Sequence, residues 1–311
     1  MDLPNLDLAD IAATVLADMQ PHLGRGRVAG YIPALARVNP RHFGLAIATC
    51  EGESAAAGDA DAAFSVQSIS KVFTLTMALE KLGSRLWTRV GREPSGSAFN
   101  SIVQLEREKG VPRNPLINAG ALVVADALLD GGDPTATIAK ITAFVRRAAD
   151  DPEIGIDTEV ASSETEVSFR NASLANFLAA EGNLTSPVAD VLRVYVNHCA
   201  LSLSCRQLAR SALYLANGGG DPLTGAKLTT PMRARRISSL MMTSGHYDAS
   251  GDFAFRVGLP GKSGVGGGVL AIAPRRAAIA VWSPGLSPQG SSLVGVMALQ
   301  RLASLTGWSV F

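Results

Sequence analysis

One stretch near the start of the chain, residues 64–83, sets the narrowest limits on the fold. It begins with residues that favour extended backbone and continues into an apolar run at residues 72–79. Apolar spacings of three and four predict a core-facing helix, which Gly83 can end as a C-cap. Ser68 and Lys71 stand three positions apart at its start, so their hydroxyl and amine can meet on one helix face.

This serine and lysine could form a reactive pair. A serine hydroxyl is a poor nucleophile until an adjacent base removes its proton. A lysine becomes such a base when burial or a nearby cation makes it neutral. The positive end of a helix N-terminus also favours negative charge on the serine oxygen. The Ser-x-x-Lys pattern occurs often by chance, so taken alone it favours an exposed serine and a solvated lysine over a reactive pair.

The composition limits the classes of protein to which the chain can belong. Its 311 residues, 47% of them hydrophobic, suit one large domain or two closely packed subdomains. The 28 basic and 27 acidic residues nearly cancel and 5% are aromatic, so neither a nucleic acid nor an anionic membrane is expected as a partner. Three cysteines without a Cys-x-x-Cys pair, an acidic start unlike a secretory signal, and no membrane-length apolar run predict a cytoplasmic protein.

Hydrophobic periodicity predicts strands near both ends of the chain and helices between them. Strands are expected at residues 43–50, 269–273 and 277–282, the last two as a hairpin. Helices are expected at residues 8–19, 68–82, 118–129, 134–149, 173–180, 186–198, 204–217, 230–242 and 291–305. These elements predict an α/β sandwich with an inserted helical subdomain, and the cleft between them would be a natural ligand site.

The same pattern predicts how the chain is divided. An N-terminal helix within residues 1–23 precedes a single domain at residues 24–310. Within that domain, the sheet subdomain would comprise residues 24–67 and 243–310, and the helical subdomain about residues 68–242. No linker is long enough to separate independent domains.

Three short patterns follow one another in a recognisable order. They are Ser68-x-x-Lys71, then Tyr195-x-Asn197, then Lys262-Ser263-Gly264. Serine hydrolases of the penicillin-recognising type carry the same three patterns in this order. Ser68 would attack a carbonyl, and Lys71 with a tyrosine phenol would accept and return the proton. The small residues at 264–268 would let the backbone approach the substrate, with an N–H facing the oxyanion.

The same residues allow two alternative sites. Residues 261–263, Gly-Lys-Ser, resemble half of a phosphate-binding loop, but Arg256 stands where that loop requires glycine and a strand pattern follows. His246 and Asp248 could join a serine in a Ser-His-Asp site, although Lys71 already offers a local base. The four histidines show no metal-ligand spacing, so neither a metal nor a cofactor is expected.

On these residues and several longer stretches, the chain resembles the serine-dependent glutaminase family. The similarity covers residues 24–310, and residues 93–100 and 112–121 are distinctive of glutaminases rather than of β-lactamases in general. Further matching stretches are residues 31–33, 38–40, 64–73, 164–166, 170–171, 187–190, 247–251 and 262–268. The resemblance implies a β-lactamase/transpeptidase-like fold, with an antiparallel sheet flanked by helices. It also implies hydrolysis of L-glutamine to L-glutamate and ammonia through a covalent acyl-serine.

The resemblance assigns roles to individual residues. Ser68 resembles the nucleophile and Lys71 its base partner, while Tyr195 and Tyr247 match two active-site tyrosines, of which Tyr247 is the expected proton shuttle. Val265 resembles the residue whose backbone N–H joins that of Ser68 in the oxyanion hole. The residues that would hold the amino-acid end of glutamine are Asn118, Glu164 and Asn171, and a supporting role falls to Asn197 and Lys262.

The chemistry of these side chains agrees with that assignment. Glu164 can pair with a substrate ammonium, and Asn118 and Asn171 can hydrogen-bond to its carboxylate or amine. Without the resemblance, Glu164 would be interpreted as a solvated loop carboxylate, and the two asparagines as helix caps.

Two histidines beside the active-site tyrosines depart from the family pattern. Glutamine is commoner where His198 stands, and another residue often replaces His246, so pH response or substrate affinity can differ. Because family members are homo-oligomers, a homodimer or homotetramer is expected. Two other functions stay open: a related serine hydrolase acting on β-lactams, peptidoglycan peptides or another amide, and a non-catalytic glutamine sensor.

Overall fold

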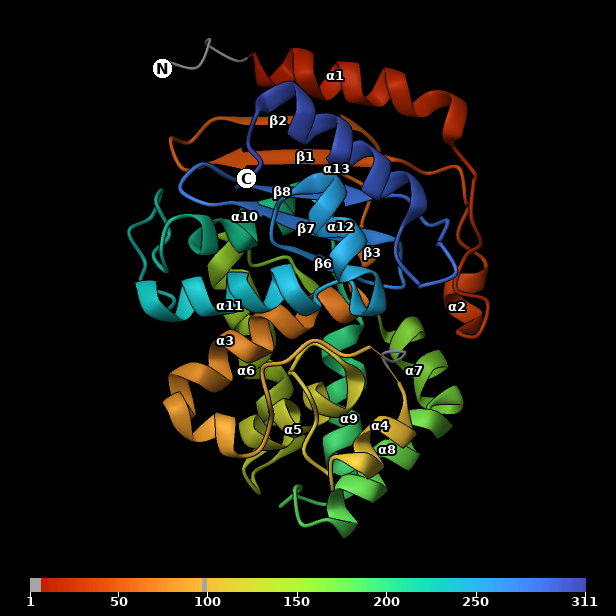
Figure 1. Ribbon diagram of the computed structural model, residues 1–311, viewed down its shortest axis with the longest axis vertical. Helices are drawn as coiled ribbons and strands as arrows, with labels where there is room; N and C mark the ends of the chain where they lie inside the picture. The colour runs from red at the N-terminus through yellow and green to blue at the C-terminus, as the bar shows by residue number, and fades with distance from the viewer. Residues whose placement is uncertain (1–6, 97–99) are drawn as a thin grey trace.

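The computed structural model of the protein describes residues 7–96 and 100–311. The chain forms a sheet-containing part and a mainly helical part, which lie one above the other in Figure 1. The first helix and the last helix both belong to the sheet-containing part, while the middle of the chain builds the helical part. Residues distant in sequence therefore meet where the two parts join.

The larger sheet has five antiparallel strands in the order β2-β1-β8-β7-β6. The strands are β1 (Gly44–Thr49), β2 (Ser54–Gly58), β6 (Gly261–Ser263), β7 (Gly268–Ala273) and β8 (Ala277–Trp282). In the register of the three central strands, Ile279 of β8 faces Ile47 of β1 on one side and Ala271 of β7 on the other. Side chains of successive residues along these strands point to opposite faces of the sheet.

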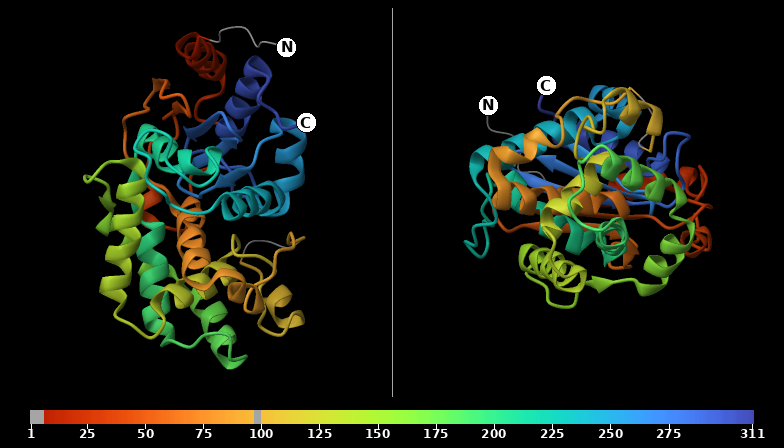
Figure 2. Two further views of the ribbon diagram at one scale, coloured as in Figure 1. Left: turned by 90° about the vertical axis from the view of Figure 1, so that its left-hand side faces the viewer. Right: turned by 90° about the horizontal axis from the view of Figure 1, so that it is seen from below.

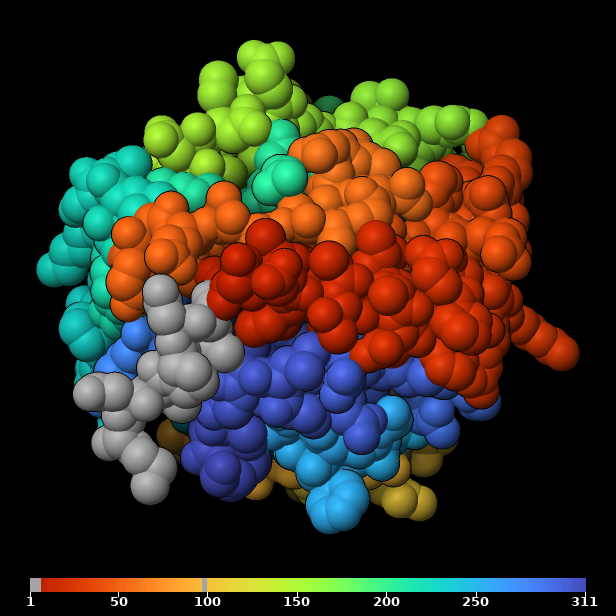
Figure 3. All heavy atoms as spheres, turned by 90° about the horizontal axis from the view of Figure 1, so that it is seen from above, coloured from red at the N-terminus to blue at the C-terminus, as the bar shows by residue number. Residues whose placement is uncertain are grey.

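Helices cover both faces of this sheet (Figure 2). Helices α1 (Leu8–Met19) and α13 (Leu293–Thr306) lie side by side over one face (Figure 3), next to α12 (Ser250–Val257). Helix α10 (Cys205–Ala216) packs against β1, β7 and β8 on the opposite face. Because neither face of β1, β7 and β8 meets water, these strands are continuous apolar runs rather than alternating ones.

The helical part is organised around α5 (Asn118–Leu129), which is buried along almost its whole length and contacts α3, α8 and α9. A helix that is apolar on every side can only be stable inside other elements. The remaining α-helices are α2 (Pro33–Ala36), α3 (Ser70–Leu82), α4 (Ile102–Arg107), α6 (Pro134–Ala149), α7 (Thr158–Val167), α8 (Phe169–Ala180), α9 (Val188–Cys199) and α11 (Pro231–Ser244). The 3₁₀ turns are η1 (Gln20–His22), η2 (Gln67–Ile69), η3 (Gly83–Thr88) and η4 (Tyr247–Ala249).

A second, small sheet was not predicted. It has three antiparallel strands in the order β3-β5-β4, namely β3 (Phe64–Ser65), β4 (Gly155–Ile156) and β5 (Leu201–Leu203). Strand β3 leads directly into η2 and α3, and β5 directly follows α9. The small sheet therefore ties the start of α3 to the end of α9.

Several predicted boundaries match the structure and others shift. The helices predicted at residues 8–19, 118–129 and 134–149 begin and end at those residues, as does the strand predicted at 277–282. The helix predicted from Ser68 begins at Ser70, because η2 comes first. The Gly-Lys-Ser segment, predicted to precede a strand, is itself strand β6. The helix predicted at residues 186–198 is α9, which begins at Val188, and the Ser186 hydroxyl accepts the Gly131 N–H.

The sheet subdomain is predicted at residues 24–67 and 243–310, and the helical subdomain at about residues 68–242. Helix α10 lies inside the range predicted to be helical, yet it packs on the large sheet. Two parts of the predictions, residues 1–6 of the N-terminal segment and 97–99 of the stretch 93–100, lie outside the described residues. Within residues 7–96 and 100–311, no helix combines the length and the apolarity needed to cross a bilayer.

Candidate active site

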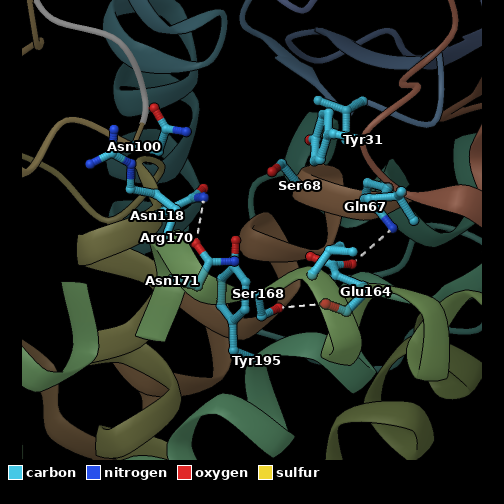
Figure 4. Close-up of a pocket in the computed structure, with 13 residues that line it drawn as sticks. Tyr31, Gln67, Ser68, Asn100, Asn118, Glu164, Ser168, Arg170, Asn171 and Tyr195 are labelled. Carbon is cyan, nitrogen blue, oxygen red and sulfur yellow. Dashed lines mark hydrogen bonds between the residues drawn. The ribbon is translucent and has the colours of Figure 1, made fainter. Parts of the chain in front are cut away.

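A pocket of about 160 Å³ opens where η2, α5, α7, α8 and α9 come together (Figure 4). This volume suits a small molecule rather than a polymer. Six of the predicted site residues line it: Ser68, Asn118, Glu164, Asn171, Tyr195 and Val265. Lys71, Tyr247 and Lys262 are also buried. Their contacts with residues around the pocket are described below.

Ser68 lies on the tight turn η2, directly before α3. The preceding residue, Gln67, has φ of +51°, a left-handed conformation that is rare for residues other than glycine. Ser68 is largely buried yet lines the pocket, where Figure 4 shows its hydroxyl. The turn thus places a hydroxyl at the pocket wall and at the beginning of a helix.

Lys71 lies in the first turn of α3 and is buried. Its Nζ donates a hydrogen bond to Oδ1 of Asn118 at 2.6 Å, so the amine lies directly behind the pocket wall. Burial lowers the pKa of Lys71 to about 8, although the charges of Cys199 and Glu164 act in the opposite direction. An appreciable fraction of this amine is therefore neutral near pH 8 and can accept a proton.

The two asparagines are joined across two helices. Asn118 Nδ2 donates to Asn171 Oδ1 at 2.9 Å, so one chain of hydrogen bonds runs from Lys71 through Asn118 to Asn171. The helix-cap interpretation does not hold, because the N-cap of α5 is Ile117 and Asn171 lies inside α8. Both amide groups are instead directed toward the pocket (Figure 4).

Glu164 lies on α7 and is 7% exposed, so it is not a solvated loop carboxylate. Gln67 Nε2 donates to Glu164 Oε2 at 3.3 Å. Burial raises the pKa of Glu164 to about 7, while the hydrogen bond from Gln67 and the charge of Lys71 lower it. A cation that enters the pocket would stabilise the ionised carboxylate.

The two tyrosines reach the site from different parts of the molecule. Tyr195, on α9, lines the pocket, and Lys71 Nζ lies 5.7 Å from the centroid of its ring. Tyr247, in η4 of the sheet-containing part, has φ of +58°. Burial raises the pKa of the Tyr247 phenol, and the neighbouring Ser68 side chain lowers it. Of the two phenols, Tyr247 is thus the one whose pKa is affected by Ser68.

Lys262 is fully buried on strand β6, beneath Tyr247. Its Nζ lies 4.3 Å from the centroid of the Tyr247 ring. It donates to the main-chain oxygens of Gly245 at 3.1 Å and Ser263 at 2.7 Å. These contacts link the Lys-Ser-Gly segment to the residues just before Tyr247.

Residues 264–267 bring main chain to the edge of the pocket at Val265. A Cβ atom at Gly264 would lie 2.3 Å from the main-chain oxygen of Val66, and one at Gly266 would lie 2.2 Å from that of Ser65. Only glycine allows such close approach of two backbones. The glycine-rich segment therefore packs directly against the turn that carries Ser68.

One predicted residue is not brought to the pocket. The Asn197 side chain donates to the main-chain oxygen of Arg193, one turn earlier in its own helix, at 2.8 Å. Conversely, sequence reasoning missed residues that line the pocket, in particular Tyr31, Gln67, Asn100 and Arg170. All four lie within stretches that resemble the family, but no chemical pattern in the sequence marks them.

The structure contradicts the two alternative sites. Gly261–Ser263 pairs with β7 as an antiparallel strand, so it cannot form a phosphate-binding loop ahead of a helix. His246 stacks on Phe253 and its Nδ1 lies 3.2 Å from Ser291 Oγ, so its ring is committed to contacts away from Ser68. Among the residues that the structure describes, no cluster of histidine, cysteine, aspartate or glutamate could hold a metal ion.

Known proteins match this chain over nearly its full length. The family model described as Glutaminase matches residues 26–311. A glutaminase of Sinorhizobium fredii is 60% identical over 98% of this chain and 97% of its own length. A thermolabile glutaminase of Rhizobium etli is 58% identical over 98% of this chain and 99% of its own.

Solved structures agree with these relatives. A probable glutaminase, ybaS, superposes with a TM-score of 0.92 at 35% identity, covering 98% of this chain and 99% of its own. The protein Mglu in its glutamate form gives a TM-score of 0.92 at 37% identity, covering all of this chain and 70% of its own. The predicted α/β fold with an antiparallel sheet is thereby confirmed, and the chain belongs to the glutaminase family.

Proposed function

We propose that this enzyme hydrolyses L-glutamine to L-glutamate and ammonia through an acyl intermediate on Ser68. Membership of the glutaminase family supports the overall reaction. The observation that supports the serine route is the arrangement around Ser68, whose hydroxyl lies at the pocket wall and whose side chain lowers the pKa of the Tyr247 phenol. Lys71, one helical turn later, is bonded to the pocket residue Asn118.

The pocket suits the charged end of an amino acid. The substrate ammonium would pair with Glu164, which is the buried carboxylate there. The substrate carboxylate would accept hydrogen bonds from the amide groups of Asn118 and Asn171 and from the Tyr195 phenol. Once this end is held, the side-chain carboxamide can extend toward Ser68, because Ser68 lies across the pocket from Asn171 (Figure 4).

The reaction would proceed in two halves. In the first, Ser68 Oγ attacks the carboxamide carbon, its proton passes to Lys71 or Tyr247, and that proton is delivered to the leaving nitrogen, which departs as ammonia. In the second, water attacks the acyl-serine, and its proton returns to Ser68 as glutamate is released. The main-chain N–H groups of Ser68 and Val265 would stabilise the negative oxygen in both halves.

Two further properties belong to this proposal. We place the enzyme in the cytoplasm, because its three cysteines are free thiols in the structure and two of them are buried. We also propose a homodimer or homotetramer, as the family resemblance implies. No cofactor takes part in the proposed reaction.

The test replaces Ser68 with alanine and measures ammonia release from glutamine and asparagine side by side. Ser68→Ala should lower kcat by roughly 10³-fold or more, because the acyl-enzyme cannot form. Rapid acid quenching of the wild-type enzyme should yield a glutamyl adduct on the peptide that carries Ser68. Retained turnover in a folded Ser68→Ala protein would disprove the serine route. Faster turnover of nitrocefin than of glutamine by the wild type would favour the related-hydrolase alternative.

A further inference from the structure

The turn that carries Ser68 holds a backbone conformation that needs support. Gln67 has φ of +51°, although it is neither glycine nor asparagine. Non-glycine residues keep a left-handed conformation only when the surrounding contacts enforce it. The contacts of the Gln67 main chain therefore determine where the neighbouring Ser68 lies.

The side chain of Ser70 provides one such contact. Ser70 is fully buried, and its Oγ donates to the main-chain oxygen of Gln67 at 2.7 Å. The same Oγ lies 2.8 Å from Nδ1 of His198. A serine hydroxyl has a single proton to donate, so Ser70 must accept the second bond from an Nδ1–H of the histidine.

This hydrogen bond defines the state of the His198 ring. His198 is 1% exposed, and its Nε2 has no hydrogen-bond partner among the described residues. Burial and the nearby charge of Lys71 lower the pKa of His198 to about 3. The ring is therefore neutral, with its proton on Nδ1 and a bare Nε2.

The position of His198 relates this contact to the rest of the site. It lies in the last turn of α9, three residues after Tyr195, and the two rings meet edge to face with centroids 5.2 Å apart. A second bond joins the same two segments, because Ser65 Oγ donates to the main-chain oxygen of Cys199 at 3.1 Å. Two adjacent residues at the end of α9 are thus bonded to the segment that carries Ser68.

We propose that Ser70 and His198 are positioning residues, which hold the Gln67–Ser68 turn at a fixed distance from Tyr195. The His198 ring donates to Ser70, and Ser70 donates to the Gln67 carbonyl, so the end of α9 sets the orientation of the strained peptide before the nucleophile. Neither residue is among those that line the pocket. This inference rests on the proposed function of Ser68 and deepens it.

The two hydrogen bonds from His198 to Ser70 and from Ser70 to Gln67 are called the relay below. Removing the relay should affect the chemical step more than substrate binding. Without it, Gln67 can relax and shift Ser68, and small displacements of a reacting atom cost on the order of 10²-fold in rate. We expect Ser70→Ala to lower kcat by roughly 10- to 100-fold. The KM for glutamine should change by less than about threefold, because Glu164 and the two asparagines stay in place.

Ser211→Ala is a matched control. Ser211 is also fully buried in a helix, and its Oγ donates to the main-chain oxygen three residues earlier, that of Leu208, at 2.9 Å. Both substitutions delete one buried hydroxyl and its bond to a main-chain oxygen, but Ser70→Ala also removes the partner of the His198 Nδ1–H, so it should lower Tm more than Ser211→Ala does. Only Ser70→Ala should lower kcat. An equal kcat for the two variants would overturn the proposal.

His198 offers a conservative variant and a disruptive one. Asparagine places an N–H close to the position of Nδ1, so His198→Asn should keep most of the wild-type kcat, whereas His198→Leu should lower kcat as Ser70→Ala does. The double variant Ser70→Ala/His198→Leu should lose no more than either single variant, because both break the same relay. Additive losses of kcat in the double variant, or equal losses in His198→Asn and His198→Leu, would contradict the proposed relay.

A spectroscopic measurement tests the relay without using activity. Nitrogen-15 NMR of histidine-labelled wild-type protein should show His198 with a protonated Nδ1 and an unprotonated Nε2 from pH 6 to 9. Ser70→Ala should remove the hydrogen-bond shift of the Nδ1 proton, and Ser211→Ala should not. A proton on Nε2 in the wild type would overturn the relay whatever the enzyme catalyses, while failure of the Ser68→Ala test would leave this measurement valid.

Discussion

Two buried lysines lie near the candidate active site, each beside a tyrosine. In the helical part, Lys71 lies 5.7 Å from the Tyr195 ring centroid and donates to the side chain of Asn118. In the sheet-containing part, Lys262 lies 4.3 Å from the Tyr247 ring centroid and donates to two main-chain oxygens. Burial lowers the pKa of both amines, so burial alone does not distinguish their roles.

Their partners do distinguish them. Lys71 is bonded to an amide that itself lines the pocket, one helical turn from Ser68, so a change in its protonation acts directly on the site. Lys262 instead joins the main chain at Gly245 to that at Ser263 and supports the segment that carries Tyr247. We therefore propose that Lys71 transfers the proton and that Lys262 orients Tyr247.

The largest expected effect is the loss of the proposed base. Lys71→Met keeps the length of the side chain but removes the amine, and it should lower kcat by about 10³-fold or more, near the upper range for a general base. Ammonia release at pH 8 measures it, with a thermal melt to show that the protein is folded. Activity above a tenth of the wild type would remove Lys71 from the mechanism.

A smaller loss is expected from Lys262→Met. The main-chain oxygens of Gly245 and Ser263 would lose their side-chain donor, at a cost of about 1–3 kcal/mol in the free energy of unfolding. The displaced Tyr247 should lower kcat by roughly 10- to 100-fold. Urea denaturation and steady-state kinetics measure the two effects. If Lys262→Met proved as inactive as Lys71→Met, the division of roles would be wrong.

The pH dependence sharpens the same comparison. A protonated Lys71 cannot accept the serine proton, and its pKa is about 8, so kcat/KM should begin to fall below pH 8. Below pH 7 the fall should exceed tenfold per pH unit, because Glu164, whose pKa is about 7, also gains a proton and no longer pairs with the substrate ammonium. Above that pH the amine is neutral and kcat/KM should level off. The midpoint of this limb should be unchanged in Lys262→Met. A shift of the midpoint in that variant would show that the two amines share the titrating proton.

The smallest effect is expected at Asn197. Its amide bonds to the main chain of its own helix, and the third residue of the Tyr-x-Asn pattern thus has no contact with either lysine among the hydrogen bonds described. Asn197→Ala should change kcat and KM by less than about twofold and the free energy of unfolding by about 0.5 kcal/mol or less. A tenfold loss of kcat would restore Asn197 to the site.

The accuracy of the sequence predictions depends on how strongly local residues mark each element. Helices α5 and α6 have the predicted bounds, because glycine and proline at residues 131–134 separate two long apolar patterns. Strands β4 and β5 have only two and three residues, too few to show an alternating pattern, and their pairing depends on contacts distant in sequence. The sheet that joins α3 to α9 was therefore missed.

The predictions of individual site residues differ in accuracy for the same reason. Ser68, Lys71 and Lys262 stand in short patterns with a chemical meaning, so they could be found without coordinates. Gln67 and Arg170 carry no such signal, because nothing in a sequence shows that a glutamine has a positive φ or that an exposed arginine borders a pocket. Asn197 is predicted as a site residue because it matches the Tyr-x-Asn pattern. Only the direction of its side chain, which the sequence does not show, distinguishes it from the predicted residues that do lie at the site.

The contact of Gly264 and Gly266 with the backbone beside Ser68 has a consequence for attempts to change what the enzyme accepts. Both sides of that contact are main chain, so a larger residue there cannot be accommodated by choosing another rotamer, and whole strands would have to move. Single substitutions of these glycines are therefore not expected to yield a pocket of altered shape. Variants that admit longer or bulkier amides should instead arise at the facing side chains, of which Tyr31 and Arg170 border the same pocket.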